Sequence, residues 1–292
     1  MMTMRYEGRV FRPPSEAYSL IVQSTIGCSH NKCTFCDMYK EKKFRVRPLH
    51  EVLEDFDLAR RAYRHIDRIF LADGDALVRK SSDWIKILEH IKRVIPECER
   101  VTSYASPKSI LAKTPSELET LHKLGLEMVY MGVESGSDTI LTKINKGETR
   151  DEIIRAGKMI MDSGIKLSVT AISGLGGTDM WEEHAVETGK AFSEIKPHYI
   201  GLLTLMFEGD TPLYRDMRAG KFKPLTAIQV AEETLVMLKN MDCEGSVFRA
   251  NHASNYINLR GTLNQDRDAM INKLEKALEG KVRFKNEAFR AL

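Results

Sequence analysis

Three cysteines, Cys28, Cys33 and Cys36, lie within nine positions of a 292-residue sequence. Three thiolates on one short loop can bind three irons of a [4Fe–4S] cubane and leave the fourth iron without a protein ligand. Such an open coordination site lets a metal centre bind a further molecule, whereas a [4Fe–4S] ferredoxin that only carries electrons supplies four thiolates. The spacing therefore predicts an iron–sulfur cluster with one iron open to a ligand.

A structural zinc site is the alternative for this loop, with His30, Cys98 or His122 as the fourth ligand. Structural zinc usually takes two ligand pairs, and the sequence has no second CxxC or HxxxH pair. Cys98 and Cys243 stand alone, which argues against a second cluster and is typical of small buried residues. We therefore expect iron and sulfide at the loop rather than zinc.

Short β-rich runs alternate with helical patterns along most of the chain. The runs cover residues 19–25, 66–72, 101–105, 127–133, 167–173, 199–206 and 246–249. Capping boxes at Thr114 and Thr149 begin two of the helices, and Gly125 and Gly164 end them. This alternation predicts an α/β fold with about six parallel strands that curl into a partial or closed (β/α) barrel. In such folds the chemistry gathers at the C-terminal ends of the strands.

The pattern changes after residue 222. A helix over residues 226–241, one strand, a loop and a final helix over residues 265–278 follow. No linker rich in Gly, Ser or Pro separates this part from the rest. We therefore predict a (β/α) core over residues 1–222, including the N-terminal segment, and a C-terminal extension of residues 223–292 packed on the core.

The composition is that of an ordinary globular protein, with 42% hydrophobic and 29% charged residues. A net charge of +3 argues against a dedicated nucleic-acid or membrane surface. The N-terminus lacks the apolar core of a secretory signal, and no apolar run approaches the roughly 18 residues of a membrane span. The cysteines do not resemble a disulfide framework. We predict a cytoplasmic protein with neither a membrane nor a nucleic acid as its partner.

Polar residues and glycines follow several predicted strands, where a bound ligand would lie. They are Asp73, Gly74 and Asp75 after the second strand, Glu134 and Ser135 after the fourth, and Ile172 and Gly174 at the fifth. Carboxylates and backbone carbonyls at a strand end can accept hydrogen bonds from the donors of a ligand. Glycine permits a ligand to approach the backbone closely. Each motif by itself is typical of a turn. We predict a binding site because all of them lie at the C-terminal ends of the predicted strands.

With these positions, the cysteine loop resembles the signature of the radical S-adenosylmethionine (SAM) superfamily, in which an aromatic residue precedes the third cysteine. Phe35 takes that place. The CX4CX2C spacing departs from the usual pattern, which has three residues between the first two cysteines. Residues 143–147 and 205–214 are similar to the branch that includes oxygen-independent coproporphyrinogen oxidases and tRNA-modifying members.

The resemblance implies two cofactors, a [4Fe–4S] cluster on Cys28, Cys33 and Cys36, and SAM. It implies that a reduced cluster cleaves SAM to a 5′-deoxyadenosyl radical, which takes a hydrogen atom from a small or medium organic substrate. An external one-electron donor of the flavodoxin or ferredoxin type is implied as well. The residues that would bind SAM by this resemblance are Phe35, Asp73, Gly74, Asp75, Glu134, Ser135, Ile172 and Gly174.

The substrate is expected to meet residues 248–256, the most polar strand exit in the sequence. Arg249 and Asn255 would orient an acidic substrate, and His252 would transfer a proton. An ordinary loop with Asn and Ser turns is the alternative. Three other functions stay open: an RNA-modifying radical SAM enzyme, a non-catalytic iron–sulfur or zinc protein, and a SAM-binding sensor.

Overall fold

The computed structural model describes residues 5–291. The chain divides into two compact units, each described by itself below. The first unit contains the chain up to Asn31, Met38–Met131 and Lys158–Leu167. The second unit contains Lys32–Asp37, Gly132–Gly157 and the chain from Ser168 onward.

Eight strands form a mostly parallel sheet. Their bounds are β1 (Leu20–Gln23), β4 (Arg68–Ala72), β5 (Arg100–Ala105), β6 (Leu126–Glu134), β7 (Lys166–Ser173), β8 (Tyr199–Thr204), β9 (Val247–Ala250) and β10 (Leu259–Thr262). They follow one another in the order β1-β4-β5-β6-β7-β8-β9-β10. This arrangement confirms the α/β fold that the alternating pattern predicts. The predicted boundary at residue 222 stays a prediction.

Each of the seven predicted runs contains a strand, but the prediction of one strand over residues 19–25 is wrong. Strand β1 ends at Gln23, and β2 (Thr25–Ile26) pairs instead with β3 (Arg45–Val46) in a separate antiparallel ribbon. Ser24 marks the break, because its N–H donates to the carbonyl of Ala72 (2.8 Å) and its own carbonyl accepts from the N–H of Arg47 (3.2 Å). Strands β3 and β10 were not predicted, since both are short and β10 contains a glycine.

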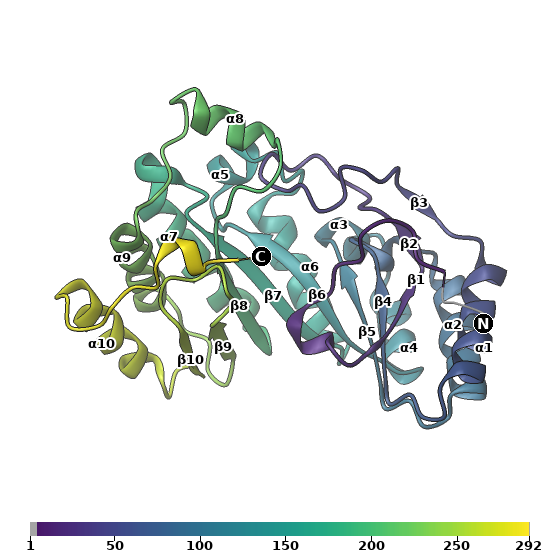
Figure 1. The fold of residues 1–292 in the computed structure, drawn as a ribbon. Coiled ribbons are helices and arrows are strands. Elements are labelled where there is room, and N and C mark those ends of the chain that lie inside the picture. Colours follow the sequence, from purple (N-terminus) through teal and green to yellow (C-terminus); the bar gives the residue numbers. More distant parts are fainter. Residues whose placement is uncertain (1–4, 292) are drawn as a thin grey trace. The chain divides into compact units, whose positions relative to one another are not determined.

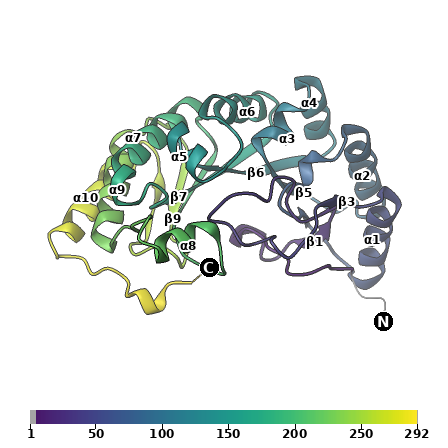
Figure 2. The same cartoon turned by 90° about the horizontal axis from the view of Figure 1, so that it is seen from above.

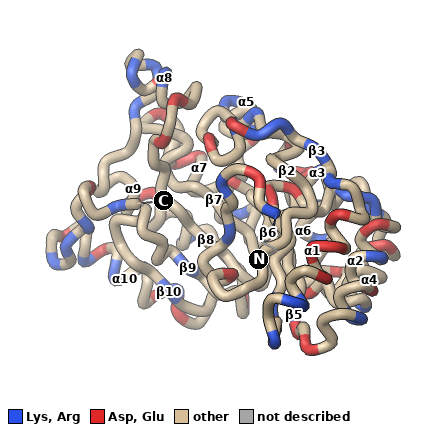
Figure 3. Tube along the Cα trace, turned by 45° about the vertical axis from the view of Figure 1, so that its right-hand side comes forward, with Lys and Arg blue, Asp and Glu red and all other residues tan. Residues whose placement is uncertain are grey.

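The helices of the first unit cover one side of its strands. They are α1 (Leu49–Ala62), α2 (Ser81–Val94), α3 (Pro107–Leu111) and α4 (Pro115–Lys123). Figures 1 and 2 show α1 and α2 side by side. The predicted capping box at Thr114 begins α4. In α2 the apolar residues at helical spacing, Trp84, Ile87, Leu88 and Ile91, are buried. Figure 3 shows acidic and basic residues on both α1 and α2. In α1 the acidic residues come first, and the basic residues Arg60 and Arg61 lie in the last turn.

An aromatic cluster and the N-terminal segment pack together inside the first unit. Phe70, Tyr104 and Tyr130 from β4, β5 and β6 meet edge to face. The hydroxyl of Tyr130 and the guanidinium of Arg100 both donate to the buried carboxylate of Glu16. The N-terminal segment is thereby held to the strands by a charge as well as by apolar contacts.

Helices of the second unit pack on one another. Their bounds are α5 (Asp138–Lys143), α6 (Arg150–Asp162), α7 (Gly177–Ile195), α8 (Pro212–Arg218), α9 (Ala227–Lys239) and α10 (Arg267–Leu278); α6 also enters the first unit. Helix α9 contacts both α7 and α10 (Figures 1 and 2). Gly189 permits the approach of α7, because a Cβ at that position would lie 2.8 Å from the carbonyl oxygen of Met237. No helix in residues 5–291 is long and apolar enough to cross a membrane.

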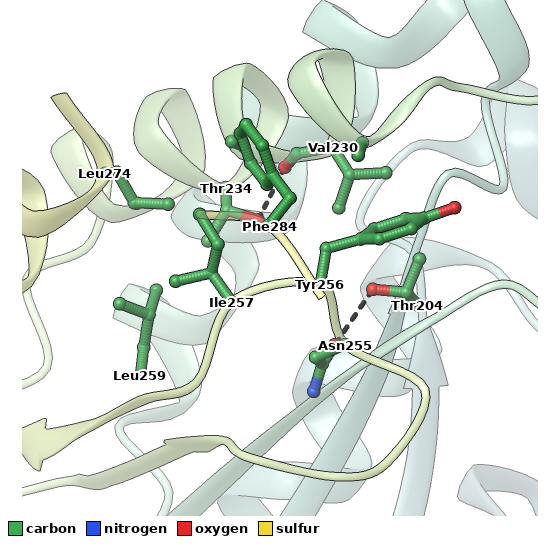
Figure 4. Close-up of a pocket in the computed structure, with 11 residues that line it drawn as sticks. Thr204, Val230, Thr234, Asn255, Tyr256, Ile257, Leu259, Leu274 and Phe284 are labelled. Atoms are coloured by element: carbon green, nitrogen blue, oxygen red, sulfur yellow. Dashed lines mark hydrogen bonds between the residues drawn. The ribbon is translucent and has the colours of Figure 1, made fainter. Parts of the chain in front are cut away.

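A small cavity lies beneath α9 in the second unit (Figure 4). Its volume of about 20 Å³ holds about one water molecule. The hydroxyl of Thr204 donates to the amide oxygen of Asn255 (2.8 Å) at its wall, and Thr234 donates to the carbonyl of Val230 (2.8 Å). This cavity is therefore part of the core and is too small for an organic substrate.

Candidate cofactor site

The first part of the cysteine loop, up to Asn31, is tied to the residues that follow β4. Gly27 has φ +78°, and its N–H donates to Asp73 Oδ2 (3.0 Å). The hydroxyl of Ser29 donates to Asp75 Oδ2 (2.5 Å). Cys28 lies between these two anchors in the sequence. Both aspartates that were predicted to bind SAM therefore accept hydrogen bonds from the cysteine loop.

The second part of the loop, residues 32–37, belongs to the second unit and has its own anchors. The N–H of Thr34 donates to the carbonyl of Ile144 (2.8 Å), and the carbonyl of Thr34 accepts from the N–H of Leu213 (3.0 Å). Asn145, with φ +53°, donates from its side chain to the carbonyl of Lys32 (3.2 Å). The end of α5 and the start of α8 thus hold the segment that carries Cys33, Phe35 and Cys36.

The donor set suits an iron–sulfur cluster. Cys28, Cys33 and Cys36 are reduced thiols that are only partly buried, whereas Cys243 is fully buried. Burial raises the pKa of Cys243 to about 11, which makes it a poor ligand. In residues 5–291 no three or more His, Cys, Asp or Glu side chains are gathered around one metal position. Ligation by the three cysteines therefore stays a prediction from their type and spacing.

Asp73 lies at the end of β4 and is fully buried. Its Oδ2 accepts from Lys42 Nζ (2.8 Å), from Gln23 Nε2 (3.1 Å) and from the Gly27 N–H. Its Oδ1 is buried without a hydrogen-bond partner in the described structure. An unsatisfied buried carboxylate oxygen fits a site that receives a donor from a ligand.

Asp75 is buried between the cysteine loop and the start of α3. It accepts from the hydroxyl of Ser29 and from both the N–H (3.0 Å) and the hydroxyl (2.8 Å) of Ser106. Among the described residues no Lys, Arg or His forms an ion pair with Asp75, in contrast to Asp73 with Lys42. Asp75 is therefore better suited than Asp73 to balance a cationic ligand.

Gly74 allows the chain to pass close to Cys28. A Cβ at this position would lie 2.8 Å from Tyr39 Cε2 and 2.9 Å from Cys28 Cβ. We expect Gly74→Ala to lower the free energy of unfolding by about 1–3 kcal/mol, because these neighbours must move, and to lower the iron bound per chain. Gly201→Ala is the matched control, since its nearest neighbour would lie at 3.6 Å. Denaturant unfolding and iron analysis check both variants, and wild-type values for Gly74→Ala would contradict the packing described.

Glu134 ends β6 with φ +64°, a left-handed conformation that is rare outside glycine. Its carboxylate lies 3.5 Å from Lys146 Nζ. Burial raises the pKa of Glu134, although Lys146 opposes the shift. Strained backbone at a strand end is frequent at binding sites, which supports the predicted role of this residue.

Ser135 and Ile172 are joined by His184 of α7. The hydroxyl of Ser135 lies 2.9 Å from His184 Nδ1, and His184 Nε2 lies 3.1 Å from the carbonyl oxygen of Ile172. Burial lowers the pKa of His184 to about 4, so the ring is neutral and donates from Nε2 to the carbonyl. The second unit therefore brings the segments after β6 and at the end of β7 together through one histidine.

Glu233 of α9 completes this group and was missed in the sequence. Its Oε1 accepts from the hydroxyl of Ser173 and from the N–H of Gly174 (2.9 Å). The side chain is fully buried, and Oε2 has no partner in the described structure. Burial raises the pKa of Glu233 to about 8. The available signal was an acidic residue on the apolar face of a helix, beside Val230 and Met237.

The raised pKa of Glu233 predicts a pH dependence of stability. Between pH about 4.5 and about 8 the unfolded chain has released this proton while the folded chain keeps it, so stability falls as pH rises. As pH rises over this window, we expect the free energy of unfolding of the wild type to fall by up to about 4 kcal/mol more than that of Glu233→Gln. Urea unfolding of both proteins at pH 5 and pH 8 checks the difference, in which the shared contribution of His184 cancels. Parallel loss in the two proteins would contradict an uncharged Glu233.

The three residues predicted to meet the substrate occupy different environments. Asn255 is buried, and its amide donates to the carbonyl of Leu202 (2.8 Å) besides accepting from Thr204. Nδ1 of His252 lies 3.0 Å from the hydroxyl of Ser254, and burial lowers the pKa of the imidazole. Arg249 is exposed within β9 and donates to backbone carbonyls. The structure thus joins Asn255 to β8 and leaves Arg249 at the surface.

Comparison with known proteins identifies the family of this chain. The family model of the radical SAM superfamily matches residues 22–189. Heme chaperone HemW of Bacillus subtilis is 22% identical over 226 residues, which are 75% of this chain and 58% of that protein. The 4′-phospho-dehydrooxetanocin synthase of Priestia megaterium is 25% identical over 64% of this chain and 28% of its own length. A tRNA-2-methylthio-N(6)-dimethylallyladenosine synthase of Chlorobium phaeobacteroides is 29% identical over 54% of this chain and 36% of its own. The chain thus spans less than two thirds of each relative.

Solved structures show the same fold. The radical SAM methyltransferase TsrM of Kitasatospora setae, with cobalamin and a [4Fe–4S] cluster bound, superposes with a TM-score of 0.54. Its sequence identity is 18%, over 69% of this chain and 37% of that one. Methylornithine synthase PylB superposes with a TM-score of 0.52 and 15% identity, over 92% of this chain and 83% of that one. These likenesses are to the fold.

Proposed function

Because the chain belongs to the radical SAM superfamily, we propose that Cys28, Cys33 and Cys36 hold its [4Fe–4S] cluster and that it acts on a small or medium organic substrate. The observation that carries the proposal is the loop of three partly buried thiols, which is anchored at Gly27 and at Thr34. When bound to these cysteines, the cluster would supply one electron for the reductive cleavage of SAM, and SAM would supply the radical that abstracts hydrogen. A flavodoxin or ferredoxin is the proposed source of that electron.

The residues at the strand ends are proposed to bind and orient SAM. Asp75 would accept from the ammonium group, since no ion pair balances its charge in the described structure. Glu134 would accept from the ribose hydroxyls, and Gly174 would let the adenine lie against the backbone. Phe35 is proposed to contact the cofactor from the cysteine loop.

The segment after β9 is proposed to face the substrate. His252 is proposed to take part in proton transfer; burial lowers the pKa of its imidazole and so favours the neutral ring. Asn255 is proposed to position this segment on β8, because both ends of its amide are bound there. Arg249 is proposed to attract an acidic group from its exposed place on β9.

RNA modification is the second candidate function. A recess of about 670 Å³ along β10 and α10 is lined by Arg260 and Lys273, together with Asp266. Cationic side chains in a recess of this size suit a phosphate backbone. Binding to RNA that weakens steeply with added salt would favour this candidate, and binding of a small molecule with little salt dependence would favour the first.

The proposed function is tested by anaerobic reconstitution with iron and sulfide, followed by addition of SAM and dithionite. We expect about four irons per chain, as a [4Fe–4S] cluster requires, and the release of 5′-deoxyadenosine. A four-iron protein that binds SAM without cleaving it would indicate a sensor. Uptake of zinc without sulfide would contradict the proposal.

A further inference from the structure

Side chains of helices α7 and α9 form hydrogen bonds with two segments of the proposed SAM site. Residues 135–137 follow β6, and residues 172–174 lie at the end of β7. The N–H of Gly136 donates to the hydroxyl of Thr188 (2.9 Å), and the hydroxyl of Ser137 donates to Glu183 (2.5 Å). Helix α7 therefore fixes the first segment through its side chains, besides the bond between Ser135 and His184.

Glu233 fixes the second segment from α9. Its Oε1 accepts from the Ser173 hydroxyl and from the Gly174 N–H (2.9 Å). Gly174 has φ +91°, where the backbone needs both a glycine and an external partner for its amide. Leu205 Cβ would be the nearest atom to a Cβ on Gly174, at 3.6 Å. Backbone hydrogen bonds also hold this segment, from the N–H of Leu205 to the carbonyl of Ser173 (2.9 Å) and from the N–H of Gly177 to the carbonyl of Gly174 (3.1 Å). The hydrogen bond to Glu233 is therefore the side-chain contact that fixes the Gly174 amide.

The two segments meet at one pair of buried side chains. His184 Nε2 is 4.0 Å from Glu233 Oε1 and 3.1 Å from the carbonyl of Ile172. Both side chains are fully buried, and Oε2 of Glu233 has no hydrogen-bond partner among the described residues. A buried unsatisfied oxygen is unfavourable, and such groups are kept where they serve a function. The polar groups that face Glu233 are His184 from α7 and Ser173 and Gly174 from β7.

We propose that Glu233 is a positioning residue that, together with His184, sets the backbone of residues 172–174 against the segment after β6 and so determines the affinity for SAM. Glu233 acts through the Gly174 amide. The inference rests on the proposed function, because that function places SAM at Gly174. The relevant property of Glu233 is its acceptor oxygen, so glutamine should replace it and leucine should not.

The test compares wild type, Glu233→Leu and Glu233→Gln by amide hydrogen exchange without SAM and by SAM affinity of the cluster-loaded protein. We expect Glu233→Leu to exchange faster at residues 173–175 than wild type while α1 and α2 stay protected. We expect its dissociation constant for SAM to rise by about 10-fold or more, as for other residues that orient a binding group. Glu233→Gln should keep the wild-type exchange pattern and an affinity within about threefold, since the acceptor remains.

Two results would overturn the inference. One is unchanged SAM affinity in a folded Glu233→Leu. The other is faster exchange throughout this variant, including α1 and α2, which would mean that Glu233 supports the fold alone. Wild-type protein with a complete cluster that does not bind SAM would contradict the proposed function itself, and the inference with it. Wild-type binding with equal affinity in Glu233→Leu would contradict only the inference.

Discussion

Replacing Cys33 by alanine is expected to abolish the cluster and to lower SAM cleavage by more than about 100-fold. Removal of a residue that merely orients a metal ligand already costs 10- to 100-fold in affinity or activity, so removal of a ligand itself should cost more. With only Cys28 and Cys36 left as ligands in this variant, two of the four irons of the cubane would have no protein thiolate. The measurement is iron and sulfide per chain after anaerobic reconstitution, together with 5′-deoxyadenosine formed with dithionite.

Cys98→Ala is the matched control for this variant. Cys98 also has a partly buried thiol, but it lies before β5 and donates weakly to the carbonyl of Arg100 (3.6 Å). Burial raises its pKa to about 11, so it is not a thiolate at neutral pH. We expect wild-type iron content and cleavage from Cys98→Ala. Equal losses in the two variants would mean that the cysteine loop is not the cluster site.

Lys42→Met is expected to lower the free energy of unfolding by about 3–5 kcal/mol, because it leaves the Asp73 carboxylate buried without its cation. The side chains of Lys42 and Asp73 are 2% and 0% exposed, and their charged atoms lie 2.8 Å apart. The double variant Lys42→Met with Asp73→Asn should recover part of the loss, since it removes the uncompensated charge. Urea unfolding of the three proteins checks this expectation.

Arg45→Met is the control for the ion pair. Arg45 and Glu7 also form a close pair (2.6 Å), but their side chains are 50% and 52% exposed. Exposed pairs contribute less than about 1 kcal/mol, so this variant should remain close to wild type. A loss as large in Arg45→Met as in Lys42→Met would show that burial does not decide the difference. A small loss in Lys42→Met would mean that Asp73 does not depend on its cation.

Local motifs in the sequence were sufficient to predict seven of the eight strands of the main sheet and the loops that follow them. The α/β fold, the capping box at Thr114 and the C-terminal helix α10 are confirmed. Asp73, Glu134 and Gly174 lie at strand ends as expected. These features depend on residues close to one another in the chain, so the pattern of a single segment contains the necessary information.

Long-range partners were not predictable in the same way. Lys42 lies 31 positions before Asp73, and Glu233 lies 59 positions after Gly174. Nothing in the local pattern around Lys42 indicates that its ammonium is buried. Glu233 and His184 did break the apolar faces of α9 and α7, but a polar residue on such a face does not identify its partner. Tertiary packing decides which charges are paired, and the sequence alone does not show that packing.

The roles within the site changed for the same reason. The sequence placed both Asp73 and Asp75 in the predicted SAM site, and the structure shows how they differ, because it pairs Asp73 with Lys42 and leaves Asp75 with neutral donors. Ser135 was expected to meet the cofactor, and its hydroxyl is bound to His184. Its contact with SAM therefore stays a prediction that now has to include the histidine.

The proposal that three cysteines hold a cluster with one iron open to SAM is tested most directly by the electron paramagnetic resonance spectrum of the reduced, reconstituted protein with and without SAM. A cluster held by three cysteines would leave one iron open to SAM, so its spectrum should shift when SAM is added. The spectrum of a cluster with four protein ligands should not shift. We expect a clear shift in the wild type and no [4Fe–4S] spectrum in Cys33→Ala. A [4Fe–4S] spectrum unchanged by saturating SAM would contradict the proposal.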